Sequence, residues 1–203
     1  MKLYYSPGAC SLSPHIVLRE AGIQAELEQV DLKTKRTKSG ADFTAVSPKG
    51  QVPALVLDDG QVLTEGPAVV QYLADRKPEA KLAPPHGTFE RYRLQEWLNF
   101  ITAELHKSFS ALFNPAAPAD YKKIATQTIE SRFAYVDAQL AKSGPFLLGA
   151  EFTAADAYLF TVANWARIHK IDVGRWPTLK AYLERIAARP HVREALREEG
   201  LLR

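Results

Sequence analysis

A proline-containing segment at residues 78–87 divides the chain into two parts with different hydrophobic patterns. Pro78, Pro84 and Pro85 would each interrupt a helix, so we expect this segment to be a linker. Before it, short strand-like runs alternate with helical runs, whereas no convincing strand follows it. This order predicts an α/β domain at residues 1–77 and an all-α domain at residues 88–203.

The first part is expected to form a mixed four-stranded sheet covered by helices. Asp58, Asp59 and Gly60 lie between two apolar runs and predict a hairpin, which makes the last two strands antiparallel. A helix between the first two strands requires them to be parallel. The expected strands are 2–5, 25–32, 53–57 and 61–63, and the expected helices are 15–21, 67–76 and a short one at 41–46.

Helical spacing of apolar residues continues through the second part. The expected helices are 88–112, 119–142, 153–169, 177–189 and 192–198. Thr153 and Asp156 stand three residues apart before an apolar run, which is the pattern of a capping box. We therefore interpret Asp156 as a structural residue and not as a catalytic acid.

Composition narrows the classes of function. The 203 residues carry 26 Lys and Arg against 23 Asp and Glu, and the basic cluster at 33–38 lacks the interleaved aromatic residues of a nucleic-acid surface. A single cysteine excludes an internal disulfide and favours a reducing compartment. No apolar run is long enough for a signal peptide or a membrane span. We expect a cytoplasmic protein that binds neither nucleic acid nor membrane, and no metal-ligand spacing is present.

That one cysteine, Cys10, is the first candidate for chemistry. It lies between a predicted strand and a predicted helix, where unpaired backbone N–H groups and the helix dipole favour a thiolate. The alternative is a buried cysteine that packs as a small hydrophobic residue.

Three further positions allow both a functional and a structural interpretation. Val52 precedes Pro53 and is held extended, so its backbone could pair with a peptide-like ligand at a sheet edge, or Pro53 could simply begin a strand. Glu65 precedes a helix and could contact a ligand's ammonium group or only cap the helix. His106 has no neighbouring metal-ligand pattern and is, taken alone, typical of a surface or packed residue.

Taken together, the motifs resemble the glutathione S-transferase family, most closely its bacterial beta class. The resemblance extends over nearly the whole chain, and the order and spacing of its motifs are specific. They are YYSPGACSL (4–12), PKGQVPAL (48–55), LTEGPAVVQYL (63–73), EWLNF (96–100), ELHK (104–107) and FTAADAYLF (152–160).

This resemblance implies a thioredoxin-like N-terminal domain that binds glutathione as a co-substrate, with no bound cofactor, in a homodimeric detoxification enzyme. Val52 would pair with the cysteinyl part of glutathione through a cis Val52–Pro53 bond. Glu65 and Gly66 would hold the γ-glutamyl end, although several relatives carry serine where this chain has Gly66. Lys35 would reach the glycyl carboxylate. Further glutathione-binding residues, some in the other subunit, would be Asn99, Ala103, Glu104, Leu105 and Lys107.

The resemblance also implies Cys10 and His106 as the catalytic pair. Tyr5 and Ser11 remain alternative donors to the thiolate, because other classes of the family keep a catalytic hydroxyl at these places. Small hydrophobic electrophiles would bind beside the sulfur. The residues that could line this site are explained equally well by ordinary core packing. These residues are Phe109, Phe113, Trp165 and His169.

Three hypotheses of function follow from these residues. The first is conjugation of glutathione to small hydrophobic electrophiles, and the second is thiol–disulfide exchange or peroxide reduction through Cys10. The third is a non-catalytic module that keeps this fold and binds ligands or partner proteins.

Overall fold

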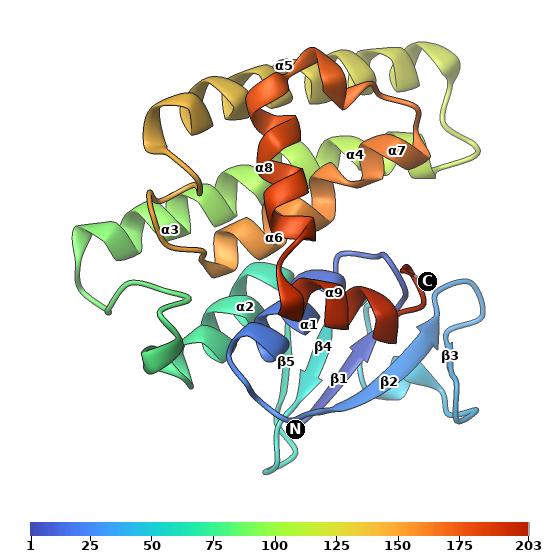
Figure 1. Ribbon diagram of the computed structural model, residues 1–203. Helices are drawn as coiled ribbons and strands as arrows, with labels where there is room; N and C mark the ends of the chain where they lie inside the picture. Colours follow the sequence, from blue (N-terminus) through green and yellow to red (C-terminus); the bar gives the residue numbers. More distant parts are fainter. Residues whose placement is uncertain (203) are drawn as a thin grey trace. The chain divides into compact units, whose positions relative to one another are not determined.

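The computed structural model describes residues 1–202, which form two compact units (Figure 1). The first unit contains Met1–Ala83 and the segment from Ala188 onward, and the second contains Pro84–Ala187. The all-α domain expected at residues 88–203 includes the segment after Ala187. This segment belongs instead to the first unit, because its helix packs against the first helix of the chain.

The first unit is built on a mixed sheet with strand order β3-β2-β1-β4-β5. Its strands are β1 (Lys2–Tyr5), β2 (Glu26–Asp31), β3 (Arg36–Thr37), β4 (Ala54–Val56) and β5 (Val62–Thr64). The β1–β2 pair is parallel and the β4–β5 pair is antiparallel, as predicted. The β1–β4 pair is also antiparallel. The expectation of four strands was wrong, because β3 pairs with the end of β2 over only two residues and lies in the basic loop.

The sheet places alternate residues of β1 on opposite faces. Leu3 and Tyr5 are buried, while Tyr4 packs with its ring centroid 5.5 Å from that of Phe43 on the other side. The predicted hairpin joins β4 to β5, and Gly60 in its turn adopts a positive φ of 84°. The strands therefore follow the hydrophobic pattern of the sequence.

Three α-helices complete the first unit, namely α1 (Leu12–Glu20), α2 (Gly66–Asp75) and α9 (Pro190–Glu198). Figure 1 shows α9 lying along α1. Short 3-10 turns occur at Phe43–Ala45 and Pro78–Ala80. Helix α1 begins three residues before the predicted start, since Pro14 falls within its first turn, where a missing N–H removes no helical hydrogen bond. The loop between β1 and α1, which contains Cys10, is therefore shorter than predicted.

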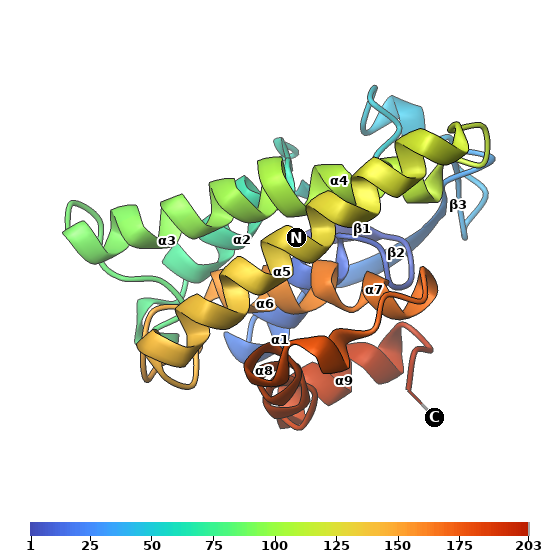
Figure 2. The same cartoon turned by 90° about the horizontal axis from the view of Figure 1, so that it is seen from above.

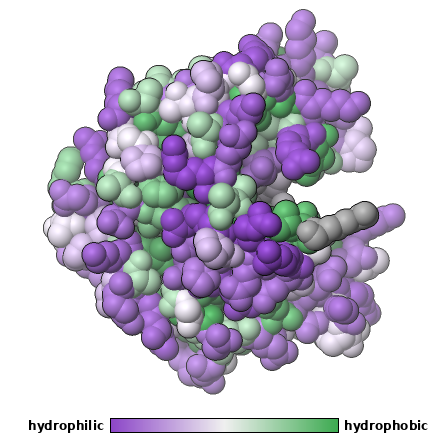
Figure 3. Space-filling view, in the orientation of Figure 1, coloured by the Kyte–Doolittle hydropathy of each residue, from purple (hydrophilic) through white to green (hydrophobic). Residues whose placement is uncertain are grey.

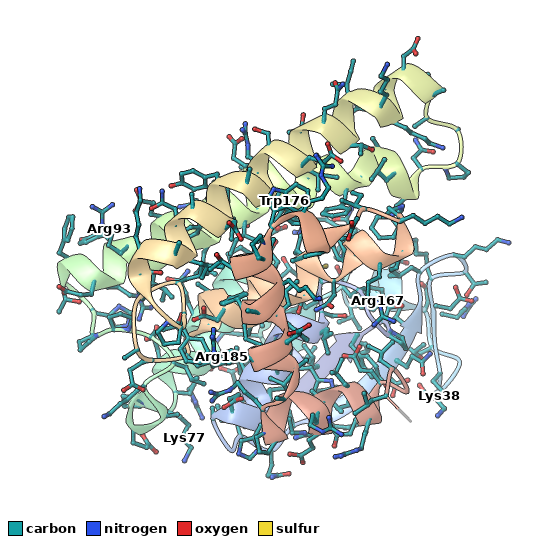
Figure 4. The ribbon with its side chains drawn as sticks, turned by 45° about the horizontal axis from the view of Figure 1, so that its top comes forward. Lys38, Lys77, Arg93, Arg167, Trp176 and Arg185 are labelled. Atoms are coloured by element: carbon teal, nitrogen blue, oxygen red, sulfur yellow. The ribbon has the colours of Figure 1, made fainter. Side chains whose placement is uncertain are left out.

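The second unit is helical. Its elements are α3 (Phe89–Phe100), η3 (Ile101–His106), α4 (Lys107–Phe113), α5 (Ala119–Ser143), α6 (Ala154–Ala163), α7 (Trp165–Ile168), η4 (Val173–Arg175) and α8 (Pro177–Ala187). Figure 2 shows α5 running beside α4. Trp176, labelled in Figure 4, precedes α8 and packs its ring 5.3 Å from that of Phe133 on α5.

The predicted helix at 88–112 is one continuous helical run with a π-helical stretch in its middle. Residues Ile101–His106 form that stretch, and the N–H of Lys107 donates to the C=O of Thr102, five residues earlier. Such wider turns are rare and occur frequently at functional sites. Here the stretch ends at His106, a candidate catalytic residue.

The capping box at the start of α6 is confirmed. Asp156 is buried, and one of its oxygens accepts hydrogen bonds of 2.8 Å from both the N–H and the hydroxyl of Thr153. The other oxygen accepts from the N–H of Leu147 and the hydroxyl of Tyr182, each at 2.9 Å. With four donors on one buried carboxylate, Asp156 joins three segments of the second unit.

Within residues 1–202, no helix has both the length and the apolar character needed to cross a membrane. The face seen in Figure 3 is mostly hydrophilic, with hydrophobic residues scattered between.

Candidate active site

Cys10 lies in the loop between β1 and α1 and is half-buried. Its Sγ donates to the C=O of Val52 at 3.2 Å. Burial raises the pKa of the Cys10 thiol to about 12, and the backbone N–H groups of Cys10 and Ser11 lower this pKa only in part. The expected thiolate is therefore wrong for the ligand-free protein, because loss of hydration at this loop outweighs the backbone donors.

The two alternative donors stand in different surroundings. The Ser11 hydroxyl is buried, donates to the C=O of Ser6 at 3.3 Å and accepts from the N–H of Ser6 at 3.1 Å, so it closes the turn before α1. Tyr5 is also buried, and burial, followed by the charges of Glu199 and Glu198, raises the pKa of its phenol. The Tyr5 side chain is thus a neutral hydroxyl.

The Val52–Pro53 peptide bond is cis, as the resemblance implied. Val52 precedes β4, which is an inner strand, so the expected sheet edge was wrong. Its C=O accepts from Cys10, and its N–H has no acceptor within residues 1–202. One backbone donor of Val52 is thus available to a ligand.

Glu65 and Gly66 form the junction between β5 and α2. Glu65 adopts a positive φ of 69°, which is uncommon for a residue with a side chain. Its exposed carboxylate pairs with the ammonium group of Lys49, which also donates to Thr64 Oγ1 at 3.0 Å. Gly66 is the first residue of α2, so its N–H has no acceptor within the helix. The junction therefore places a backbone N–H that can bind an anion next to a carboxylate.

Lys35 lies in the loop between β2 and β3 and also has a positive φ, of 58°. Its ammonium group donates to the C=O of Gly50 at 2.9 Å, two residues before Val52. The structure thus ties Lys35 to the segment that carries the cis bond.

The loop that carries Cys10 is also held by Glu199, the residue that directly follows α9. Glu199 accepts from the N–H of Gly8 at 2.8 Å through one oxygen, and its other oxygen lies 2.9 Å from Nδ1 of His15. Nε2 of His15 lies 2.7 Å from Glu198, and Arg19 donates two hydrogen bonds to Glu198. Because the His15 side chain is completely buried, this network fixes α9 to both α1 and the loop.

His106 lies in the second unit, where η3 meets α4. Its Nδ1 is 2.7 Å from the hydroxyl of Tyr158 on α6, and its ring meets that of Trp165 edge-on at 4.8 Å between centroids. The imidazole of His106 is therefore oriented by two side chains of its own unit.

Four of the other expected glutathione-binding residues of this unit are exposed, namely Asn99, Ala103, Glu104 and Lys107. The Glu104 carboxylate accepts from Nε of Arg132 on α5 at 2.9 Å. Leu105 is completely buried and packs in the core of the second unit.

The residues expected to bind an electrophile fall into two groups. Phe109 and Trp165 are buried and belong to the aromatic core, with ring centroids 5.6 Å apart. Phe113 is 47% exposed, and its ring meets that of the half-buried His169 edge-on at 4.5 Å. Burial lowers the pKa of His169, and its Nε2 has no hydrogen-bond partner among residues 1–202. Only Phe113 and His169 therefore retain a surface that solvent reaches to any large extent.

Sequence reasoning missed the residues that support the site. In the sequence, Tyr158 is part of the apolar run after the capping box. A tyrosine in such a run indicates a buried hydroxyl, and a buried hydroxyl requires a hydrogen-bond partner. His15 and Glu199 are 184 positions apart, and no local pattern relates them.

The chain matches known proteins over its whole length. Residues 8–76 match the N-terminal domain of glutathione S-transferases, and residues 100–190 match their C-terminal domain. The chain belongs to the glutathione S-transferase family, and it is a glutathione transferase of the bacterial beta-class type.

Three relatives illustrate this assignment. Glutathione S-transferase GstA of Escherichia coli O157:H7 is 49% identical over 99% of this chain and 100% of its own. A bacterial beta class glutathione S-transferase of Sphingomonas chungbukensis is 46% identical, with a TM-score of 0.96 and complete coverage of both chains, each 100%. A sphingomonad glutathione S-transferase complexed with glutathione is 45% identical, with a TM-score of 0.95 over 99% of this chain and 100% of that one.

Proposed function

We propose that this transferase conjugates the thiolate of glutathione to small hydrophobic electrophiles. The observation that carries the proposal is the corner made by Cys10 and the cis Val52–Pro53 bond, where a thiol and an unused backbone N–H stand together. The glutathione-bound sphingomonad relative supports glutathione as the ligand of this corner.

Each end of glutathione finds a complementary group in the first unit. The Val52 N–H would pair with the cysteinyl carbonyl, and the helix N-terminus at Gly66 would bind the γ-glutamyl carboxylate. Glu65 would accept from the γ-glutamyl ammonium group, and Lys35 would attract the glycyl carboxylate. Asn99, Ala103, Glu104 and Lys107 of the second unit would complete the site, some of them from the other subunit of a homodimer.

The central chemical task is to keep the glutathione sulfur as an anion. A free thiol has a pKa of about 8.5, and lowering it by about 2 units requires about 2.7 kcal/mol of preferential stabilisation of the anion. A protonated Cys10 suits this task, because its S–H could turn from the C=O of Val52 to donate a hydrogen bond to a neighbouring thiolate, and a neutral thiol does not compete with that thiolate as a nucleophile. We assign the backbone N–H groups of Cys10 and Ser11 and the imidazole of His106 as further donors.

Phe113 and His169 are the best candidates to contact the electrophile, since they combine an aromatic surface with partial exposure. Phe109 and Trp165 would support them from the core. The substrate class that fits is small, apolar and aromatic, including aryl halides.

Steady-state assays with glutathione and an aryl halide test the proposal. We expect turnover by the wild-type protein and a loss of about tenfold or less in Cys10→Ala, which removes one donor among several. No turnover by folded protein that binds glutathione in calorimetry would exclude conjugation and favour a binding module.

Thiol–disulfide exchange through Cys10 is the second candidate, favoured by the partial exposure of this residue. Its high pKa argues against it, since exchange requires a thiolate. Reduction of a glutathione mixed disulfide that disappears in Cys10→Ala, while conjugation is undetectable in both proteins, would establish exchange as the activity.

A further inference from the structure

Lys49 lies in a tight turn at residues 47–50, directly before the segment with the cis bond. Its ammonium group donates to Thr64 Oγ1 at 3.0 Å and pairs with the carboxylate of Glu65. Thr64 is the last residue of β5 and Glu65 is the residue before α2, so the Lys49 side chain extends from its turn to the β5–α2 junction. A cation from a separate loop thus lies at the place proposed for the γ-glutamyl end of glutathione.

The start of α2 offers only one backbone donor to a carboxylate at this junction. Pro67 has no N–H, and the N–H groups of Ala68 and Val69 both donate to the C=O of Glu65 at 3.0 Å. The N–H of Gly66 is left without an acceptor in the helix. None of Gly66, Pro67 and Ala68 has a side-chain donor. A ligand carboxylate has two oxygens, so its second oxygen needs a donor from outside the helix.

Lys49 can supply that donor. An ammonium group has three N–H donors, and the residues described by the structure provide Lys49 with two acceptors, Thr64 and Glu65. The Lys49 and Glu65 side chains are 48% and 66% exposed, and ion pairs this exposed contribute little to stability. The pair can therefore rearrange around a ligand at small cost, while the contact with Thr64 is kept.

Glu65 also influences the sulfur site. Burial is the main cause that raises the pKa of the Cys10 thiol, and the charge of Glu65 adds to this increase. The Glu65–Lys49 pair is thus close enough to act on Cys10 electrostatically. A cation kept beside Glu65 reduces the negative charge that a glutathione thiolate would meet there.

The γ-glutamyl end of glutathione carries an ammonium group and a carboxylate on the same carbon atom. The two side chains of the pair have the complementary charges, also side by side. We propose that Lys49 is a specificity-determining residue, whose ammonium group binds the α-carboxylate of the γ-glutamyl end while Glu65 binds its ammonium group. This inference rests on the proposed function, because it takes glutathione as the ligand.

Calorimetry with two ligands tests the role of Lys49. The ligands are glutathione and 4-aminobutyryl-cysteinylglycine, which lacks only the α-carboxylate. We expect the wild type to prefer glutathione, and this preference to fall about fivefold in Lys49→Met, which is a large effect for an exposed ion pair. Lys49→Arg keeps the charge and should keep most of the preference. An unchanged preference in folded Lys49→Met would overturn the proposal.

Lys35→Met is the matched control. Lys35 is tied to the other side of the same turn, since its ammonium group donates to the C=O of Gly50 at 2.9 Å. Both ligands retain the glycyl carboxylate that Lys35 would attract, so this variant should weaken both by the same factor and leave the preference unchanged. If the preference falls as far as in Lys49→Met, the effect is a general loss of positive charge and the proposal fails.

A purely competitive role of Lys49 predicts a different result. If Lys49 only blocks Glu65, Lys49→Met should bind both ligands more tightly by the same factor, because both retain the ammonium group. That outcome would also overturn the proposal. The same titrations separate this inference from the proposed function: no binding of glutathione by the wild type overturns both, whereas binding with a preference that does not depend on Lys49 overturns only the role of Lys49.

Discussion

At the scale of single residues, the sulfur of Cys10 is subject to two opposing effects. Local structure alone supplies the backbone N–H groups of Cys10 and Ser11, which favour the anion. Tertiary packing removes water from the same atom, and this desolvation dominates, so that the thiol stays protonated. The sequence predicted the first effect and could not predict the second, because burial depends on segments that are distant along the chain, such as Val52.

This balance predicts how Cys10 reacts with pH in the ligand-free protein. With a pKa of about 12, its alkylation by iodoacetamide should be slow at neutral pH and still rise steeply above pH 9. The urea-unfolded chain should instead level off above its ordinary pKa of about 8.5. Mass spectrometry of the alkylated protein measures both rates, and a plateau below pH 9 in the folded protein would contradict the assignment.

The same shift predicts a loss of stability in alkali. Above a pH of about 8.5 the unfolded chain releases the Cys10 proton while the folded chain keeps it, so the unfolded state gains free energy as pH rises. Cys10→Ala lacks this group and should lose less stability between pH 8 and 10. Urea titrations of both proteins at several pH values provide the comparison.

At the scale of secondary structure, the periodic spacing of apolar residues predicts most strands and helices. It does not predict the short strand β3 or the π-helical stretch within a helix. The Asp-Gly turn correctly predicted the antiparallel pair β4–β5, and the helix between the first two strands correctly predicted that β1 and β2 are parallel. Strand β3 covers two residues, too few for any pattern, and the π-helical turn at Ile101–His106 continues the apolar spacing of an α-helix. Such local departures are decided by side-chain packing, so the sequence carries no separate signal for them.

The contact of α9 with α1 depends on one buried carboxylate. Glu199→Ala would remove a carboxylate that accepts from the N–H of Gly8 and lies 2.9 Å from Nδ1 of His15, at a place where the Glu199 side chain is 0% exposed. We expect a loss of about 3 kcal/mol in the free energy of unfolding, measured with urea, since removing one partner of buried hydrogen bonds leaves the other groups without compensation for their lost hydration.

Glu194→Gln is the control for this prediction. Glu194 is 49% exposed and lies 3.8 Å from Nε of Arg19 in the same pair of helices. Exposed ion pairs contribute little, so the change should be within about 0.5 kcal/mol. Equal losses of unfolding free energy in the two variants would show that the burial of Glu199 does not make its contacts more stabilising than those of Glu194.

At the scale of the whole chain, the linker at residues 78–87 and the change of hydrophobic pattern predicted two parts of different architecture. What the sequence did not reveal is the return of the last helix to the first unit. That return depends on Glu198 and Glu199 meeting His15 and Arg19, and charged residues at a helix end are by themselves typical of solvent exposure.

A chain that ends at Ala187 tests how much the first unit depends on this return. Removing α9 exposes the buried face of α1 and leaves His15 and Arg19 without their carboxylates. We expect hydrogen exchange in α1 and in the Cys10 loop to accelerate strongly, and exchange in α5 to change far less, since α5 lies in the other unit. Unchanged protection of α1 would show that the unit is complete without its last helix.

The same topology has a consequence for biosynthesis. A ribosome makes the Cys10 loop long before Glu199, which lies 191 positions after Gly8, so the loop cannot reach its final structure until that residue has been synthesised. Until Glu199 has been synthesised, the side of α1 that α9 covers stays exposed to solvent. We expect a chaperone to bind the nascent chain during that interval.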